Sequence, residues 1–166
     1  LDSLLELEPF YSLLEIGCSC GHNLNLIQKK SSGLNLAGID IEPRSIAKAH
    51  DELRQIDLEV GNFVTLPWNT NQFDIVLADA VLMYLDGEEI HKAMDEIDRV
   101  CKKAVVIIDR FDESVEGVRN GDVRARNYDK LLQDRGFTVT KTKIKKEFWP
   151  KGIGWQKFGY VFVGQR

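Results

Sequence analysis

Short apolar runs of strand length alternate along the chain with amphipathic segments of helix length. This alternation is typical of repeated strand–helix units, whose strands form a parallel sheet that helices cover on both faces. The pattern predicts strands at residues 12–16, 35–40, 57–60, 73–78 and 103–109, and helices at residues 22–31, 43–53, 88–100 and 127–135.

The last thirty residues break the alternation. Residues 137–148 and 155–163 are extended, and because we expect no helix between them, they predict an antiparallel hairpin. Lys141, Lys143 and Lys145 occupy every second position of its first arm. Alternating lysines commonly protect an exposed edge strand from aggregation, with anion binding as the alternative.

The length of 166 residues, with 43% hydrophobic and 29% charged residues, fits one domain spanning residues 1–166. The sequence has neither an apolar run of about 18 residues nor a charged-then-apolar leader, so we expect a cytoplasmic protein with no membrane partner. The chain begins with Leu1 rather than Met, which leaves room for an N-terminal lid that this sequence does not contain.

Cysteine spacing and charge change this picture little. Cys18, Cys20 and Cys101 form neither a disulfide framework nor a zinc spacing, so we expect no metal. The net charge is −4, but the first hundred residues carry 7 Lys and Arg against 18 Asp and Glu, and the rest carry 15 against 8. A basic C-terminal third indicates either an anionic partner or a solvated, lysine-rich sheet edge, and we favour the edge.

The most informative stretch follows the first predicted strand. Residues 13–24 read Leu-Leu-Glu-Ile-Gly-Cys-Ser-Cys-Gly-His-Asn-Leu, an acidic residue followed by a glycine-containing turn into a helix. Such a turn lets a ligand approach the backbone, and the helix N-terminus offers free N–H groups to an anion. A dinucleotide fingerprint would need glycine where Ser19 and His22 stand, which weakens a dehydrogenase interpretation.

This stretch resembles motif I of the class I S-adenosylmethionine-dependent methyltransferases, an acidic residue and Gly-x-Gly-x-Gly, often followed by x-Asn-Leu. Glu15, Gly17 and Gly21 match the motif, and Ser19 replaces its middle glycine. The resemblance implies that these residues and Cys18 bind the cofactor, with the Ser19 hydroxyl available to its methionine carboxylate. The first strand is also similar to that of methylases associated with pseudaminic acid biosynthesis.

The ends of the second and third predicted strands resemble further cofactor motifs of this family. Asp40 would accept hydrogen bonds from both ribose hydroxyls, and Ile41 would form a wall of the adenine slot. Asn62 would accept from the adenine amino group, and Phe63 would pack on the base or belong to the core. The alternative for Asp40 is an acid that stabilises the start of the next helix.

Residues 73–85 resemble the family's fourth strand and the loop beneath the transferred methyl group, which implies that Asp79 and Tyr84 are the catalytic candidates. Asp79 would hold the cofactor's amino group or take the substrate proton, unless it only stabilises the loop. Tyr84 stands where many small-molecule methyltransferases carry histidine. A phenol with a pKa near 10 is a poor base at neutral pH, so Tyr84 would orient or pack the substrate.

The segment after the fifth strand carries Arg119, Arg124 and Arg126, at a place where the family often inserts substrate-binding elements. Guanidinium groups clamp carboxylates and phosphates bidentately, so these arginines predict an anionic substrate. A solvated loop explains them equally well.

The family resemblance implies an α/β, Rossmann-like, doubly wound fold: a seven-stranded, mostly parallel sheet with a C-terminal antiparallel hairpin. It implies S-adenosylmethionine as cofactor, S-adenosylhomocysteine as product, and methyl transfer to an oxygen or nitrogen of a small, anionic or sugar-like metabolite. The base-methylating loops Asn/Asp-Pro-Pro-Tyr and Pro-Cys are absent, which disfavours nucleic acid. Two alternatives stay open: a non-catalytic S-adenosylmethionine-binding regulatory module, and a nucleotide-linked oxidoreductase.

Overall fold

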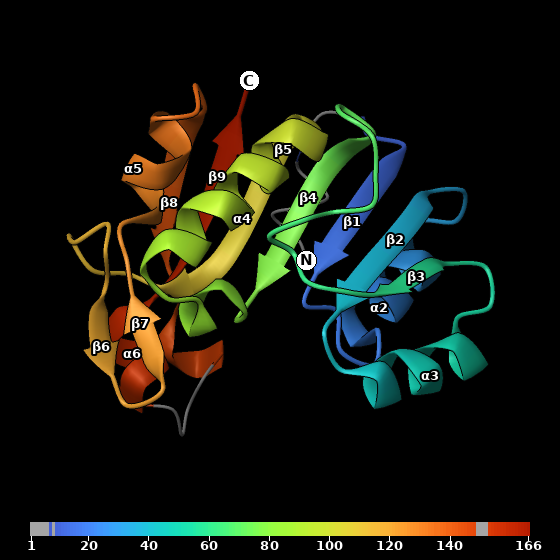
Figure 1. Cartoon of the computed structure of the whole chain (residues 1–166), viewed down its shortest axis with the longest axis horizontal. Coiled ribbons are helices and arrows are strands. Elements are labelled where there is room, and N and C mark those ends of the chain that lie inside the picture. Colours follow the sequence, from blue (N-terminus) through green and yellow to red (C-terminus); the bar gives the residue numbers. More distant parts are fainter. Residues whose placement is uncertain (1–6, 8, 149–152) are drawn as a thin grey trace.

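The computed structural model describes residue 7, residues 9–148 and residues 153–166. Within these residues, seven strands form one sheet in the order β3-β2-β1-β4-β5-β9-β8 (Figure 1). β1 to β5 run parallel, and β9 runs antiparallel to both of its neighbours. The strands of the sheet are β1 (Ser12–Ile16), β2 (Asn35–Asp40), β3 (Asp57–Val60), β4 (Phe73–Asp79), β5 (Cys101–Arg110), β8 (Thr138–Lys143) and β9 (Gly159–Gln165).

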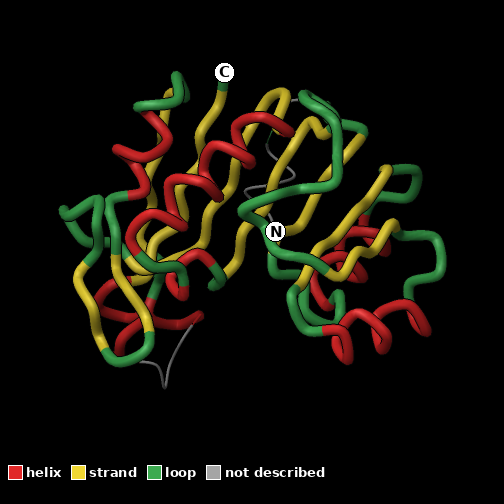
Figure 2. Tube along the Cα trace, viewed as in Figure 1, coloured by secondary structure: helices red, strands yellow, loops and turns green. Residues whose placement is uncertain are grey.

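Helices cover both faces of this sheet, as the alternating pattern predicts (Figure 2). Apolar residues of α4 and α5 pack with β4, β5 and β9 in one core cluster, and those of α2 and α3 pack with β1 and β2 in a second. None of the described helices is long and apolar enough to cross a membrane. The helices are α2 (His22–Lys30), α3 (Pro43–Glu52), α4 (Gly87–Val100), α5 (Tyr128–Gln133) and α6 (Ile153–Phe158), with 3-10 turns η1 (Leu82–Tyr84) and η2 (Lys146–Phe148).

Local sequence accounts for where these helices begin. Pro43 is the first residue of α3, where its missing N–H costs no hydrogen bond, and the Glu42 side chain accepts from the Arg44 N–H. α4 begins with a capping box, in which Asp86 and Glu89 each accept from the other's backbone N–H. The expected helices and parallel strands are confirmed, with ends that differ by at most two residues.

The C-terminal hairpin needs a correction. β8 and β9 are antiparallel neighbours, as expected, but η2 and α6 lie between them, and β9 begins at Gly159 rather than Trp155. Trp155 is buried and lies in α6. Its backbone packs closely against Gly159, since a Cβ at position 159 would lie 2.6 Å from the Trp155 carbonyl oxygen. Lys141 and Lys143 lie on the edge strand β8, whereas Lys145 lies beyond its end.

A second, unexpected hairpin lies between β5 and α5. Its two short strands, β6 (Val118–Asn120) and β7 (Val123–Ala125), are antiparallel and form a separate sheet. Gly121 makes their turn with a φ of 67°. In Figure 1 this hairpin lies at the end of the sheet where β4 and β5 finish.

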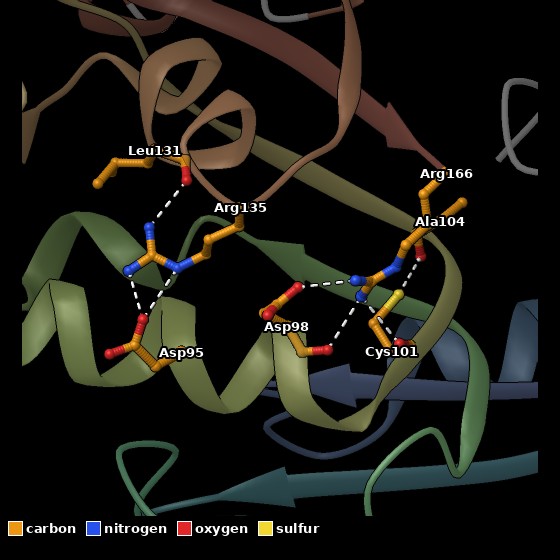
Figure 3. Close-up of polar contacts among 7 residues, drawn as sticks. All are labelled: Asp95, Asp98, Cys101, Ala104, Leu131, Arg135 and Arg166. Atoms are coloured by element: carbon orange, nitrogen blue, oxygen red, sulfur yellow. Dashed lines mark hydrogen bonds and ion pairs between the residues drawn. The ribbon is translucent and has the colours of Figure 1, made fainter.

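Two arginines fasten α4 to the elements beside it (Figure 3). Arg135, just after α5, binds the Asp95 carboxylate at 2.6 Å and donates to the Leu131 carbonyl. Arg166, after β9, binds the Asp98 carboxylate at 3.0 Å and donates to the Cys101 carbonyl at 2.9 Å. These contacts hold α4 against the residues that follow α5 and β9.

Candidate functional site

The turn between β1 and α2 has the tight geometry that its sequence predicts. Gly17 and Gly21 have φ values of 71° and 75°, in the left-handed region that favours glycine. A Cβ on Gly17 would lie 2.4 Å from a Val81 methyl, and one on Gly21 would lie 2.4 Å from a Leu53 methyl. Ser19 has a φ of 48°, so the turn holds a non-glycine residue in a conformation that costs free energy and persists mainly at functional sites.

An amide joins two carboxylates beneath this turn. Glu15, on β1 between β2 and β4, accepts from Asn23 Nδ2 at 2.8 Å, and Asp79, at the end of β4, accepts from the same nitrogen at 3.0 Å. Glu15 is 2% exposed, and its Oε2 has no hydrogen-bond partner. Burial raises the pKa of Glu15 to about 8, although the hydrogen bond from Asn23 lowers it. Burial is also the main cause of the raised pKa of Asp79. A cation beside them would stabilise both ionised carboxylates.

Asp40 connects the turn to the second strand. Its Oδ2 accepts from the Ser19 N–H at 2.8 Å, and its Oδ1 accepts from the Glu42 N–H at 2.9 Å. A carboxylate oxygen has two lone pairs, so both oxygens keep an acceptor site for a ligand hydroxyl. Ile41 and Val60 are 67% and 50% exposed at the ends of β2 and β3, which supplies apolar surface beside Asp40.

Three of the predicted cofactor residues have contacts within the chain itself. Asn62 Oδ1 accepts from the Val64 N–H at 3.0 Å, and Phe63 is 8% exposed within the core, which is the second of its two expected roles. The Cys18 side chain is buried in the other core cluster, where Gly38 makes room for its sulfur. Burial raises the pKa of Cys18 to about 12, so it stays a thiol, and only its backbone borders the turn.

The loop after β4 carries the other candidate residues. Ala80, with a φ of 53°, directs the chain from Asp79 into η1, whose last residue is Tyr84. The Tyr84 side chain is 61% exposed. Asp79 and Tyr84 therefore lie at the same edge of the sheet as Glu15 and Asp40, where the parallel strands end and ligands of open α/β sheets bind.

The three predicted arginines separate into two groups. Arg119 and Arg124 are opposite each other on β6 and β7, and both contact Asp86, at 3.6 Å and 2.9 Å. Arg126 is fully buried and donates to the backbone carbonyls of Leu82 and Leu85. In this structure Arg126 therefore contacts the loop and not solvent, which differs from the expected anion clamp.

Asn23 is the site residue that the sequence arguments did not assign. It belongs to the x-Asn-Leu continuation of the motif, which was the available indication. Its amide bridges Glu15 and Asp79 because the first turn of α2 faces the ends of β1 and β4.

The residues of this edge fit S-adenosylmethionine. The unpartnered Glu15 Oε2 and the raised pKa values of two carboxylates match a positively charged ligand. The free acceptor sites of Asp40 match a ribose diol, and the exposed Ile41 matches an aromatic base. Together with the strand order and the antiparallel β9, they define a class I S-adenosylmethionine-dependent methyltransferase domain.

Comparison with known proteins gives the same class. Residues 14–108 match the family described as methyltransferase domain, which is more than half of the chain, and the chain belongs to this family. The cofactor of the family is S-adenosylmethionine.

Two curated proteins are similar over most of the chain. An uncharacterised protein of Haemophilus influenzae is 27% identical over 156 residues, which cover 89% of this chain and 57% of that protein. An uncharacterised methyltransferase of Alkaliphilus oremlandii is 24% identical over 158 residues, which cover 82% of this chain and 72% of that protein. The chain thus spans little more than half the length of the first of these relatives.

Among solved structures, the fold is similar to geranyl diphosphate C-methyltransferase from Streptomyces coelicolor A3(2), in complex with Mg²⁺, geranyl diphosphate and S-adenosyl-L-homocysteine. The TM-score is 0.77 at 17% identity, and the match covers 99% of this chain and 77% of that chain. At this identity the similarity demonstrates the fold alone.

Proposed function

We propose that this chain transfers the methyl group of S-adenosylmethionine to an oxygen or nitrogen of a small anionic acceptor, such as an acidic sugar derivative. The observation that carries the proposal is the position of Arg119 and Arg124 beside the loop that follows β4. Arg119 and Arg124 both contact Asp86, which lies two residues after Tyr84 in the chain, and this contact supports a role for the two guanidinium groups in acceptor binding.

The binding roles follow from the geometry of the strand ends. Asp40 would accept hydrogen bonds from the ribose hydroxyls, and Ile41 would contact the adenine. Asn62 Oδ1 keeps a second lone pair, which would accept from the amino group of the adenine. The backbone from Gly17 to Gly21 would face the methionine portion, with Ser19 donating to its carboxylate. Glu15 would balance the positive charge of the bound cofactor.

The bound cofactor supplies an activated sulfonium methyl, so the protein mainly needs to align the acceptor and exclude water. Tyr84 would orient or pack the acceptor from its exposed position on η1. Asp79 would bind the cofactor's amino group or take the acceptor's proton. Its raised pKa makes it a better base near neutral pH than an ordinary carboxylate.

A methyltransferase of similar fold takes an anionic substrate. Geranyl diphosphate C-methyltransferase binds a diphosphate ester, which is itself an anion. That enzyme methylates carbon, whereas we expect product analysis for this chain to place the methyl group on oxygen or nitrogen.

Release of S-adenosylhomocysteine in the presence of acceptor panels tests this proposal. The panels should pair each acidic or phosphorylated sugar with its neutral counterpart. We expect turnover with anionic acceptors and a rise in their KM of at least about 100-fold in the Arg119→Gln/Arg124→Gln double variant, because charged hydrogen bonds contribute about 1.5–3 kcal/mol each. The affinity for S-adenosylhomocysteine should not change.

A Lys48→Gln/Lys92→Gln variant is the matched control, because it removes the same charge from exposed positions of α3 and α4. Turnover of only the neutral acceptors, or an equal loss in both double variants, would contradict the anionic acceptor. Cofactor binding without turnover of any acceptor would favour the regulatory module. Binding of a nicotinamide dinucleotide in place of S-adenosylhomocysteine would favour the oxidoreductase.

A further inference from the structure

Arg126 is a charged side chain with no exposed surface, which is rare because removing a guanidinium from water is costly. Its two terminal nitrogens donate to the carbonyls of Leu82, at 3.2 Å, and Leu85. These carbonyls stand on either side of Tyr84. The guanidinium therefore closes the turn that presents the catalytic candidate.

Asp109 holds the same turn from the end of β5. It is also fully buried, and its Oδ2 accepts from the Met83 N–H at 3.1 Å, while its Oδ1 accepts from the Arg110 N–H at 2.7 Å. The backbone of residues 82, 83 and 85 is thus bound by side chains from two elements that are distant in the sequence.

Two features accompany the burial of Arg126 and Asp109: an electrostatic interaction between them, and a chain segment that covers Arg126. Burial raises the pKa of Asp109 to about 7, while the Arg126 charge acts in the opposite direction and favours the ionised form. The buried ring of Tyr128 lies beside both residues. Gly117, with a φ of 87°, passes directly over Arg126, since a Cβ there would lie 2.7 Å from Arg126 Cγ. The backbone of Arg126 also binds the end of β5, because the Arg126 N–H donates to the Arg110 carbonyl at 2.9 Å.

We propose that Arg126 and Asp109 are positioning residues that fix the backbone of residues 82–85 and thereby direct Tyr84 toward the acceptor. Neither side chain touches the cofactor or the acceptor in this proposal. Its relevance to catalysis rests on the proposed function, but the positioning itself is a property of the chain alone.

Hydrogen–deuterium exchange of the cofactor-free protein tests the positioning directly. We expect Arg126→Met and Asp109→Leu to raise the exchange rate of peptides that cover residues 82–86 on the order of tenfold, while peptides from β1 and β4 keep their protection. Lysine lacks the planar fork, so Arg126→Lys should give an intermediate increase, and Asp109→Asn, which keeps an acceptor oxygen, should give a small one.

Asp74→Asn is the matched control, because Asp74 is a buried carboxylate near the first residue of β4, at the other end of the parallel strands, where it accepts from the Tyr11 N–H. It should leave residues 82–86 unchanged. Equal loss of protection throughout the chain in the Arg126→Lys and Asp109→Asn variants, or no change at residues 82–86, would overturn the proposal.

An acceptor assay then separates positioning from general stability. In Arg126→Lys the KM for the acceptor should rise while the dissociation constant of S-adenosylhomocysteine stays the same. If the protein fails to bind S-adenosylhomocysteine at all, the proposed function fails, but the exchange result still decides whether the two residues hold the turn.

Discussion

At the scale of single residues, Glu15 makes stability depend on pH. Burial raises its pKa to about 8 from an ordinary value of 4.5, so the folded chain binds this proton more tightly than the unfolded chain does. The free energy of unfolding should therefore fall as the pH rises from about 5 to about 8. In Glu15→Gln the fall should be smaller, by up to about 1.4 kcal/mol per pH unit, in urea unfolding at pH 5, 6.5 and 8.

The control for this experiment is Glu59→Gln, which changes an exposed carboxylate on β3. Its pH dependence should be that of the unmodified protein. Burial also raises the pKa of Asp109, to about 7, so part of the dependence will remain in Glu15→Gln. If Glu15→Gln follows the unmodified protein at every pH, Glu15 does not carry the buried proton.

Gly17 offers a second residue-scale prediction. Gly17→Ala places a Cβ 2.4 Å from Val81 at a φ of 71°, so it combines backbone strain with overpacking, and we expect a loss of about 2–4 kcal/mol in unfolding free energy. The measurement is urea unfolding, with S-adenosylhomocysteine titration to detect the loss of the turn.

Gly33→Ala is its control, because Gly33 also has a positive φ, 101°, but open space around the added methyl group. It should cost only about 1 kcal/mol. Equal losses in the two variants would mean that the contact with Val81 is unimportant.

How well the sequence predicts single residues depends on what sets the direction of the side chain. Glu15, Gly17 and Asp40 could be found because they stand at strand ends and turns, where backbone geometry alone places them at the sheet edge. Arg126 and Phe63 could not be placed, because their burial depends on contacts with segments far away in the sequence.

At the scale of elements, the edge strand β8 is held by one of its lysines. The Lys141 ammonium lies 2.7 Å from an Asp129 carboxylate oxygen on α5 and 3.6 Å from the centre of the Phe111 ring. Lys143, two positions along, lies 5.8 Å from the Tyr160 ring. We expect Lys141→Gln to lower the unfolding free energy by about 1 kcal/mol in urea unfolding, because it removes a partly shielded ion pair and a cation–π contact.

Lys143→Gln is the matched substitution on the same side of the strand. It should change the unfolding free energy by less than about 0.5 kcal/mol. Identical effects of the two substitutions would show that the contacts of Lys141 with α5 and Phe111 contribute nothing specific.

The elements themselves could be predicted where a periodic pattern was long enough. β2 and β3 have the predicted bounds, because turn residues stand on both sides of each segment. The β6–β7 hairpin was missed because its strands have three residues each, too few to show an alternation. α6 was missed because Ile153, Trp155 and Phe158 are residue types that favour strands. Gly159 and Gly121, which shape them, look like any loop glycine in the sequence.

At the scale of the whole molecule, the strand order brings residues from four separate strands to one edge. Asp40 and Asp79 are the last residues of β2 and β4, and Glu15 is the last but one of β1. Asp109, on β5, binds the backbone of the loop that follows β4. The parallel sheet follows from alternating strands and helices, and the antiparallel C-terminal strands were expected, but the position of β9 between β5 and β8 was not predicted from the sequence. The proposed acceptor-binding face, which comprises the β6–β7 hairpin and η1, is the part for which sequence periodicity carries the least information.

The central claim is that this edge binds S-adenosylmethionine, and calorimetric titration with S-adenosylhomocysteine tests it most directly. We expect micromolar binding by the unmodified chain. Asp40→Ala should weaken it on the order of 100-fold, because two charge-assisted hydrogen bonds to the ribose are lost, and the exposed Glu59→Ala should not change it. No binding by the unmodified chain, or equal binding by Asp40→Ala, would contradict the account.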